Sequence, residues 1–472
     1  MTRPRALLWA ATAAFGVGFA ALAVQRHRAF ATGRFDLGNM TQAVWSTAHG
    51  RFLEITDLSG EQISRLGAHF DPILAAFAPL WLVWPDPSLL LVVQAIAVAL
   101  GAPAVFLLAR RHLGSDAAGL AFALAYLLYP PVEWLVVSEF HPVALATPLL
   151  LWGFWFLEDD RLVAFALVAG LACLTKEHVG LVVAAIGIWH WLAHDRRREG
   201  LAIAAAGTAV AVLAIAVVVP HYAPGGGSPF AGRYESVGGS PGGIARTAVR
   251  HPGRVTKAAT EGRDGRYLAQ LVWPLAGLPL LSPATLTAAP ELAANLLSDT
   301  KTQTSIHYQY TAGAIPGLLV GAILGAAWLV RRRPEVTRWL PVAVLAVGLV
   351  ANVRLAPIPA WQHVPGGNAL GADEADVTAH DRVLARAAEL IPADAPVSAT
   401  NALGGHLSER RRIFSFPRLR EARWVAVDIR QASALDRISA PRTFAAALAR
   451  VRADPRWRVV FAEDGVVVLR RS

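Results

Sequence analysis

The sequence predicts an α-helical protein that crosses a membrane many times and ends in a small α/β domain. Of its 472 residues, 54% are hydrophobic and only 17% are charged, and the mean hydropathy is +0.42. Soluble domains usually carry about 25% charged residues. The apolar residues also form long blocks, many close to the ~20 residues that a spanning helix needs. Residues 374–472 lack such blocks and have the mixed pattern of a water-exposed domain.

Apolar blocks predict about 11 spans, several of them shorter than a helix perpendicular to the bilayer requires. They are 6–24, 88–109, 116–130, 143–157, 162–175, 179–193, 201–220, 267–281, 283–297, 312–330 and 336–353. A further apolar piece, 72–84, is followed by Pro85-Asp86-Pro87. Because it is too short to span, we expect it to form an interfacial or re-entrant helix.

Basic residues mark one side of the predicted membrane. Arg3 and Arg5 precede the first span, and arginine clusters at 110–111, 196–198 and 331–333 end later spans. Since arginine-rich short loops stay in the cytoplasm, we expect the N-terminus to be cytoplasmic. The opposite side then receives the first loop 25–87, the long loop 221–266 and everything after residue 354.

The end of the chain is predicted to be a separate domain outside the cytoplasm. We divide the chain into a transmembrane domain (1–355), a linker (356–373) and an α/β domain (374–472). Val383, Leu384 and Ala387 fall on one face of a helix. The other expected elements are a buried strand at 423–429, a helix at 443–455 that stops before Pro455, and a β-hairpin at 457–470.

Other functional classes receive little support. The one cysteine, Cys173, lies in an apolar segment, so no intrachain disulfide and no cysteine metal site is expected. The net charge is +10, but the basic residues are spread over helix ends and loops, which argues against a nucleic-acid partner. No phosphate-binding loop, nucleophile elbow or zinc-protease motif occurs.

Ionisable and aromatic side chains gather in the predicted outer loops. They are Asp36; His69 and Asp71; Glu139 and His141; Lys176, Glu177 and His178; and His307, Tyr308 and Tyr310. Singly they have structural explanations: Asp36 and Asp71 could cap helices, and Tyr308 could belong to an interfacial aromatic belt. Together they predict one pocket, in which acids act as general base or metal ligands and cations hold phosphate.

Several segments resemble a known family. They are "FDLGNMTQAVW", "HFDPIL", "EFHPVALATPLLL", "KEHVGL", "LLSPATLTAAPELAANLLS", "IHYQYTAGAIP" and, in the tail, "VSATNALGGHLSERRRIFSFP". They look like those of a bacterial family of predicted membrane proteins of unknown function, common in actinobacteria. The arrangement more broadly resembles the GT-C glycosyltransferase superfamily.

The resemblance implies a sugar transferase in the bacterial plasma membrane. Its donor would be a polyprenyl-phosphate sugar and its acceptor a cell-envelope glycan, lipid or protein. Asp36, the first-loop acid, would be the general base in an inverting reaction. The negative charge of the phosphate would be balanced by Lys176, His141, Arg65 or Arg233. Asp36, Glu139 and Glu177 are candidate ligands of a divalent cation such as Mg²⁺ or Mn²⁺, although His178 stands where a second acid is expected in relatives.

Two other functions are compatible with the same sequence features. A transporter or flippase for a lipid-linked glycan would also have short, broken spans and ionisable residues at membrane level. It predicts charges near the middle of the bilayer and related halves of the chain, and no repeat is visible. A non-catalytic scaffold is the third alternative, and it requires that the outer polar residues do not converge.

Overall fold

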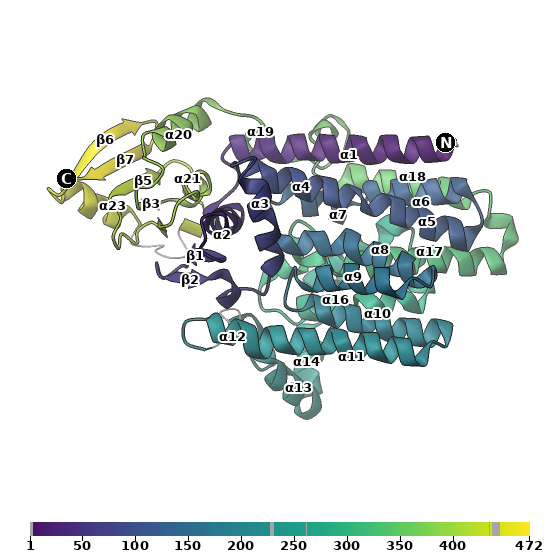
Figure 1. Ribbon diagram of the computed structural model, residues 1–472. Helices are drawn as coiled ribbons and strands as arrows, with labels where there is room; N and C mark the ends of the chain where they lie inside the picture. The colour runs from purple at the N-terminus through teal and green to yellow at the C-terminus, as the bar shows by residue number, and fades with distance from the viewer. Residues whose placement is uncertain (1–2, 227–230, 261, 434, 437–443) are drawn as a thin grey trace.

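A bundle of roughly parallel helices makes up most of the computed structural model, which describes residues 3–226, 231–260, 262–433, 435–436 and 444–472. The N-terminus lies at one end of this bundle, and a small β-sheet region that contains the C-terminus lies beyond the other (Figure 1). We call the end next to the sheet the domain end and the opposite end the far end.

The bundle is built from apolar helices, as predicted. In the described residues, four helices are long and apolar enough to cross a membrane: α1 (Arg3–Arg28), α4–α5 (Ser88–Leu113), α11–α12 (Arg197–Tyr222) and α17 (Ala314–Arg332). A bent pair, α6 (Asp116–Leu127) and α7 (Pro130–Val137), makes a fifth if it is one span. The shorter apolar helices are α8 (Ala146–Glu158), α9 (Leu162–Cys173), α10 (Val179–His194) and α18 (Leu340–Leu355).

Two predicted spans, 267–281 and 283–297, are not continuous helices. This part of the chain forms α15 (Gly262–Val272), η7 (Trp273–Leu275), η8 (Leu278–Leu281), η9 (Pro283–Ala288) and α16 (Ala289–Leu296). The reason is proline, which lacks an amide donor and clashes with the preceding turn. Pro274, Pro279 and Pro283 each stand at the start of a short 3₁₀ helix. Hydropathy alone does not register these breaks.

The long loop after α12 contains helices of its own. They are η6 (Ala231–Val237), α13 (Pro241–Arg250) and α14 (Pro252–Ala258), and α13 and α14 project from one side of the bundle below α11 (Figure 1). The remaining connections are η10 (Lys301–Thr304), η11 (Gln309–Thr311), η12 (Pro334–Val336), η13 (Pro359–His363) and α19 (Ala372–Ala375).

Helices α10 and α11 pack with their backbones in close contact, because glycines face each other across the seam. A Cβ atom added to Gly187 would lie 2.6 Å from Ala204 N and 2.7 Å from Gly200 O. One added to Gly207 would lie 2.5 Å from Gly180 O. Small residues allow this approach, which is typical of helix pairs in membranes.

We therefore expect Gly187→Leu to destabilise the protein by about 3 kcal/mol, the upper end of the usual cost of overpacking. The matched control is Gly170→Leu on α9, where nothing lies within 4 Å of the added Cβ. Thermal unfolding in detergent should show a lower melting temperature for the first variant alone. Equal melting temperatures would refute the glycine seam.

The C-terminal region is a five-stranded mixed sheet with strand order β4-β3-β5-β7-β6. Its strands are β3 (Val397–Ala399), β4 (Ile413–Ser415), β5 (Trp424–Asp428), β6 (Trp457–Glu463) and β7 (Val466–Arg471). Strand β3 is parallel to β4 and β5, whereas β7 is antiparallel to β5 and β6. Its helices are α20 (Ala379–Glu389), α21 (Asn401–His406) and α23 (Phe444–Ala453). The predicted strand and hairpin are confirmed, and the predicted helix 443–455 is present as α23, with residue 443 outside the described ranges.

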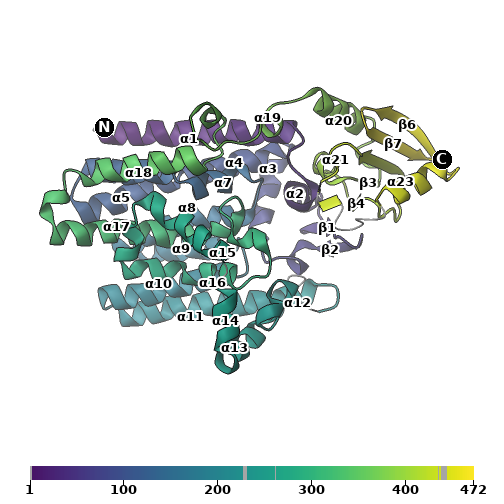
Figure 2. The same ribbon diagram turned by 180° about the vertical axis from the view of Figure 1, so that it is seen from behind.

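The chain after α1 fills the space between the bundle and the sheet (Figure 2). It forms η1 (Arg34–Gly38), α2 (Asn39–Ala48), the hairpin β1 (Glu54–Thr56) and β2 (Gln62–Ser64), η2 (Arg65–Gly67), η3 (Pro72–Phe77) and α3 (Ala78–Trp81). The short helix expected at 72–84 is present as η3 and α3. Leu82 and Val83, which follow it, are strongly exposed, as residues at a membrane interface would be.

Candidate functional site

Asp36 lies at the domain end of the bundle, in the turn that connects α1 to α2. The turn is a single stretch of π-helix, η1, an irregularity that is frequent at functional sites. Oδ1 of Asp36 lies 3.2 Å from Nε2 of His141, which precedes η4 (Pro142–Leu145). The Asp36 side chain is 43% exposed, whereas that of His141 is only 7% exposed. His141 therefore contacts Asp36 from the protein interior, while the Asp36 carboxylate remains accessible to a reactant.

Glu139 holds the backbone on either side of Asp36. Its Oε2 accepts hydrogen bonds from the amides of Gly33 (3.0 Å) and Leu37 (2.9 Å). Glu139 has a φ of 74°, a left-handed conformation that costs energy in a residue with a long side chain. Gln94 of α4 fixes this turn, since its amide group donates to Glu139 O (2.7 Å) and accepts from His141 N (2.8 Å).

The two carboxyl groups are driven toward different protonation states. Burial alone would raise the pKa of Asp36, but His141, Arg65 and Lys176 lower it below the ordinary value. Burial and the charge of Asp36 raise the pKa of Glu139 to about 8. At neutral pH, Asp36 is ionised and Glu139 holds a proton. Such a split between neighbouring carboxyls separates a group that can act as a base from one that cannot.

The raised pKa of Glu139 predicts how the stability of a variant depends on pH. Because folded Glu139 keeps a proton that the unfolded chain releases above about pH 4.5, its contribution to stability falls as the pH rises toward 8. Glu139→Gln replaces the titratable carboxyl group by a neutral amide, so this loss of stability with rising pH is absent from the variant. The melting temperature of the variant, relative to wild type, should therefore increase from pH 5 to pH 8.

The control for this measurement is Glu335→Gln at the far end, where the carboxylate is 64% exposed and lies near Arg333. Its difference from wild type should change little over the same range. A Glu139→Gln difference that is flat, or that falls with pH, would contradict the assignment.

Arg65 is locked beside Asp36 by other polar groups. Its guanidinium bonds Asp71 through Nη2 (2.8 Å) and Nε (3.0 Å), and Nη1 donates to Oδ1 of Asn39 (2.8 Å). The Arg65 and Asp71 side chains are 5% and 1% exposed. Asp71 is thus the anchor of a fixed cation rather than a free acid, and it makes no capping hydrogen bond to η3.

The turn between α9 and α10 brings Lys176 and Glu177 to the same place. Glu177 accepts from the amide of Phe70 (3.1 Å) and lies 3.0 Å from Nδ1 of His69. Burial and the charge of Lys176 lower the pKa of His69 to about 3, so its ring is neutral at physiological pH. In the described part of the chain, the Lys176 ammonium forms no hydrogen bond and no ion pair. It is the cation of the site that remains available to an anion.

The remaining predicted site residues differ in where they lie relative to Asp36 and Lys176. Nε2 of His178 lies 2.6 Å from Oε2 of Glu291, and Arg233, whose charge acts on Lys176, contacts the hydroxyl of Tyr310 (3.4 Å). His307 instead packs on the ring of Trp134, with 4.3 Å between ring centroids. Tyr308 is 41% exposed. In the described parts of the chain, neither His307 nor Tyr308 contacts the residues around Asp36. We call these residues the Asp36 cluster: Asp36, Arg65, Glu139, His141, Lys176 and Glu177.

The candidate metal ligands do not come together as a set of three, although Asp36 and Glu139 are neighbours. Within the described ranges, no three His, Cys, Asp or Glu side chains are grouped to hold a metal ion. Glu139 and Glu177 both accept hydrogen bonds from backbone amides, and Asp36 faces His141. As a set, these three residues do not fit a divalent cation.

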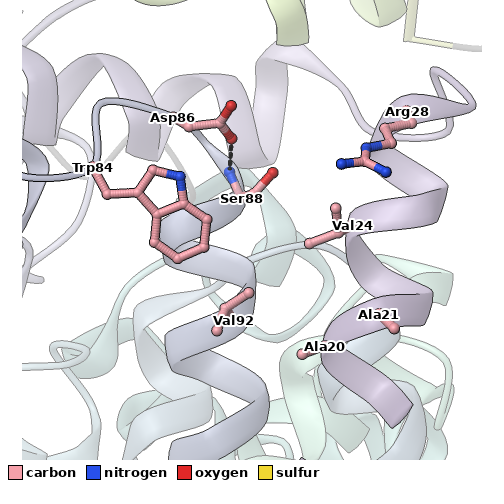
Figure 3. A pocket seen from close by; sticks show the side chains of 8 residues that line it. All are labelled: Ala20, Ala21, Val24, Arg28, Trp84, Asp86, Ser88 and Val92. Atoms are coloured by element: carbon pink, nitrogen blue, oxygen red, sulfur yellow. Dashed lines mark hydrogen bonds between the residues drawn. The ribbon is translucent and has the colours of Figure 1, made fainter. Parts of the chain in front are cut away.

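A groove of about 300 Å³ lies near this end of the bundle, between α1 and the start of α4 (Figure 3). Its lining residues are Ala20, Ala21, Val24, Arg28, Trp84, Asp86, Ser88 and Val92. The apolar side chains lie below, and Arg28 and Asp86 stand on opposite sides of its mouth. The groove shares no residue with the Asp36 cluster.

Comparison with solved structures identifies the fold. The crystal structure of ArnT from Cupriavidus metallidurans in the apo state matches with a TM-score of 0.51 and 14% identity, over 92% of this chain and 93% of that one. The chain thus has a fold similar to that of ArnT. The chain itself belongs to the family described as "Predicted membrane protein (DUF2079)", whose model matches residues 26–468. A search of curated proteins gives no match.

Proposed function

We propose that the protein is a GT-C-type glycosyltransferase that takes a sugar from a polyprenyl-phosphate donor. The main support for the proposal is that one site contains both an ionised, accessible carboxylate and an ammonium with no ion-pair partner among the described residues. Asp36 is 43% exposed and kept ionised by His141, Arg65 and Lys176. Lys176 lacks a partner among the described residues. The first group suits a general base, and the second suits a phosphate.

The reaction follows from these roles. Asp36 accepts the proton of an acceptor hydroxyl while that oxygen attacks the anomeric carbon of the sugar. The new C–O bond forms as the bond between the anomeric carbon and the phosphate oxygen breaks, and its electron pair leaves with polyprenyl phosphate. Attack from the face opposite the leaving group inverts the anomeric centre. No second acid is needed, because phosphate is a good leaving group.

Lys176 stabilises the leaving phosphate by direct contact, and the fixed charge of Arg65, which is paired with Asp71, adds to the positive potential at the site. Fixed cations aimed at developing charge lower the barrier without reorganising during the reaction. Arg65 is prearranged by Asp71 and Asn39. We further propose that the domain end faces away from the cytoplasm, which follows from the arginine clusters at the far end. The acceptor is then a component of the cell envelope.

The proposal is tested with purified protein in lipid nanodiscs. The protein would be given polyprenyl-phosphate donors carrying a radiolabelled sugar, together with extracted envelope glycans, lipids and proteins. We expect label to move to an acceptor and polyprenyl phosphate to be released in equal amount. Intact donor in every combination, with a donor set that covers the common envelope sugars, would refute the function.

A further inference from the structure

The C-terminal region contacts the turn that presents Asp36, and the proposed chemistry does not explain this contact. Helix α21 lies directly against η1. A Cβ atom on Gly38 would be 2.5 Å from Ser408 Oγ, and one on Gly404 would be 2.8 Å from the Cβ of Arg34. A side chain on Gly33 would overlap the amide group of Asn401. At each of these three glycines, a side chain would therefore clash with the opposite segment.

We propose that Asn401 is a positioning residue for Asp36, acting through the backbone of the η1 turn. Its Oδ1 accepts a hydrogen bond from the amide of Phe35 (3.1 Å). Glu139 holds the amides of Gly33 and Leu37 from the bundle side. The turn is thus held from both sides, with the Phe35 amide bound by the C-terminal region. The catalytic role of Asp36 rests on the proposed function, whereas the holding of the turn does not.

Asn401 is itself fixed by the sheet. The backbone amide of Asn401 donates to Oδ1 of Asp436 (2.7 Å). The backbone amide of the preceding residue, Thr400, donates to Ala426 O of β5 (3.0 Å). The hydroxyl of Thr400 accepts from the amide of Asp428 (3.1 Å). Because α21 begins at the end of β3 and Thr400 is bonded to β5, the position of Asn401 is determined by these two strands rather than by a loose loop.

Arg34, next to Asp36 in the turn, makes a second connection. Its guanidinium donates to Ser415 Oγ (2.7 Å) and Ile413 O (2.9 Å) of β4, and to Thr56 O (2.7 Å) of β1. The residue is only 2% exposed. Asn401 and Arg34 therefore join the C-terminal sheet to the two residues that directly precede Asp36, Arg34 and Phe35. A misplacement of about 1 Å in such a group can lower the rate about 100-fold.

The first arm of the test is hydrogen exchange, which needs no substrate. Asn401→Ala should speed exchange in peptides that cover residues 33–38 and leave peptides over 65–77 unchanged. Asn401→Asp keeps an acceptor oxygen and should restore slow exchange. The control, Arg386→Ala, removes an exposed pair with Glu463 in the same region and should alter neither segment. Wild-type exchange at 33–38 in Asn401→Ala would overturn the inference.

The second arm is turnover of the donor. We expect Asn401→Ala to lower kcat about 100-fold with KM for the donor nearly unchanged. Asn401→Asp should recover most of kcat but lose activity at a higher pH on the acidic side, because its charge favours protonation of Asp36. Equal loss of kcat and donor binding in Asn401→Ala would contradict positioning. If wild type turns over no donor, the proposed function fails, while the exchange result still decides the role of Asn401.

Discussion

Replacing Asp36 by Asn is expected to reduce sugar transfer by about 100- to 10,000-fold, the usual worth of a general base. Asn has nearly the same shape but cannot accept the acceptor's proton. Because Gly33 and Leu37 are held by Glu139, the turn should keep its conformation. Release of polyprenyl phosphate by the purified variant would measure the loss, and the affinity for the donor should change little.

The matched control is Asp159→Asn at the far end, whose carboxylate is 40% exposed and lies near Arg111. It has nearly the same exposure as Asp36 and should keep full activity. If Asp36→Asn retains more than about a tenth of wild-type turnover, far above the loss expected of a missing base, Asp36 is not the base.

Lys176→Gln is expected to weaken donor binding by about 10- to 100-fold, since a hydrogen bond to a charged group is worth roughly 1.5–3 kcal/mol. The ammonium forms no ion pair in the described residues, so its removal leaves no buried acid stranded by loss of a direct partner. Binding of polyprenyl phosphate itself would be measured, because the sugar contributes nothing to this contact.

The binding measurement needs a control variant and a pH profile of activity. Lys257→Gln, which removes an exposed lysine of α14, should bind as wild type does. The pKa of Asp36 should also rise in Lys176→Gln, because the nearby positive charge that lowers it is gone. The activity of the variant would then fall at a higher pH on the acidic side. Unchanged affinity for polyprenyl phosphate would exclude Lys176 as its anchor.

The convergence of the site could be predicted from the sequence, because topology decides it. Hydropathy and the arginine clusters placed Asp36, His69, Glu139 and Lys176 in loops at one end of a bundle, and the structure brings these loops together. The same reasoning was wrong for residues 267–297, where each proline interrupts a stretch that is apolar enough to span. It also included His307, which packs on Trp134 instead.

The partners that orient the site were not predictable in this way. Gln94 lies in the middle of an apolar helix, and its role depends on the turn at Glu139 and His141. Glu291 becomes the partner of His178 only because α16 folds back beside α10. Asn401 is far from Asp36 in sequence, and its contact depends on how the sheet docks. Such pairings arise from tertiary packing, which local patterns do not encode.

The most direct test of the central claim distinguishes transfer from transport. Protein reconstituted in sealed vesicles would receive a polyprenyl-phosphate donor with a labelled sugar and a water-soluble acceptor on one side. We expect a new glycosidic bond with inverted anomeric configuration to form, and we expect Asp36→Asn to lower the rate of its formation about 100- to 10,000-fold. Movement of intact labelled lipid across the membrane, without cleavage of its sugar–phosphate bond, would exclude sugar transfer and indicate a transporter.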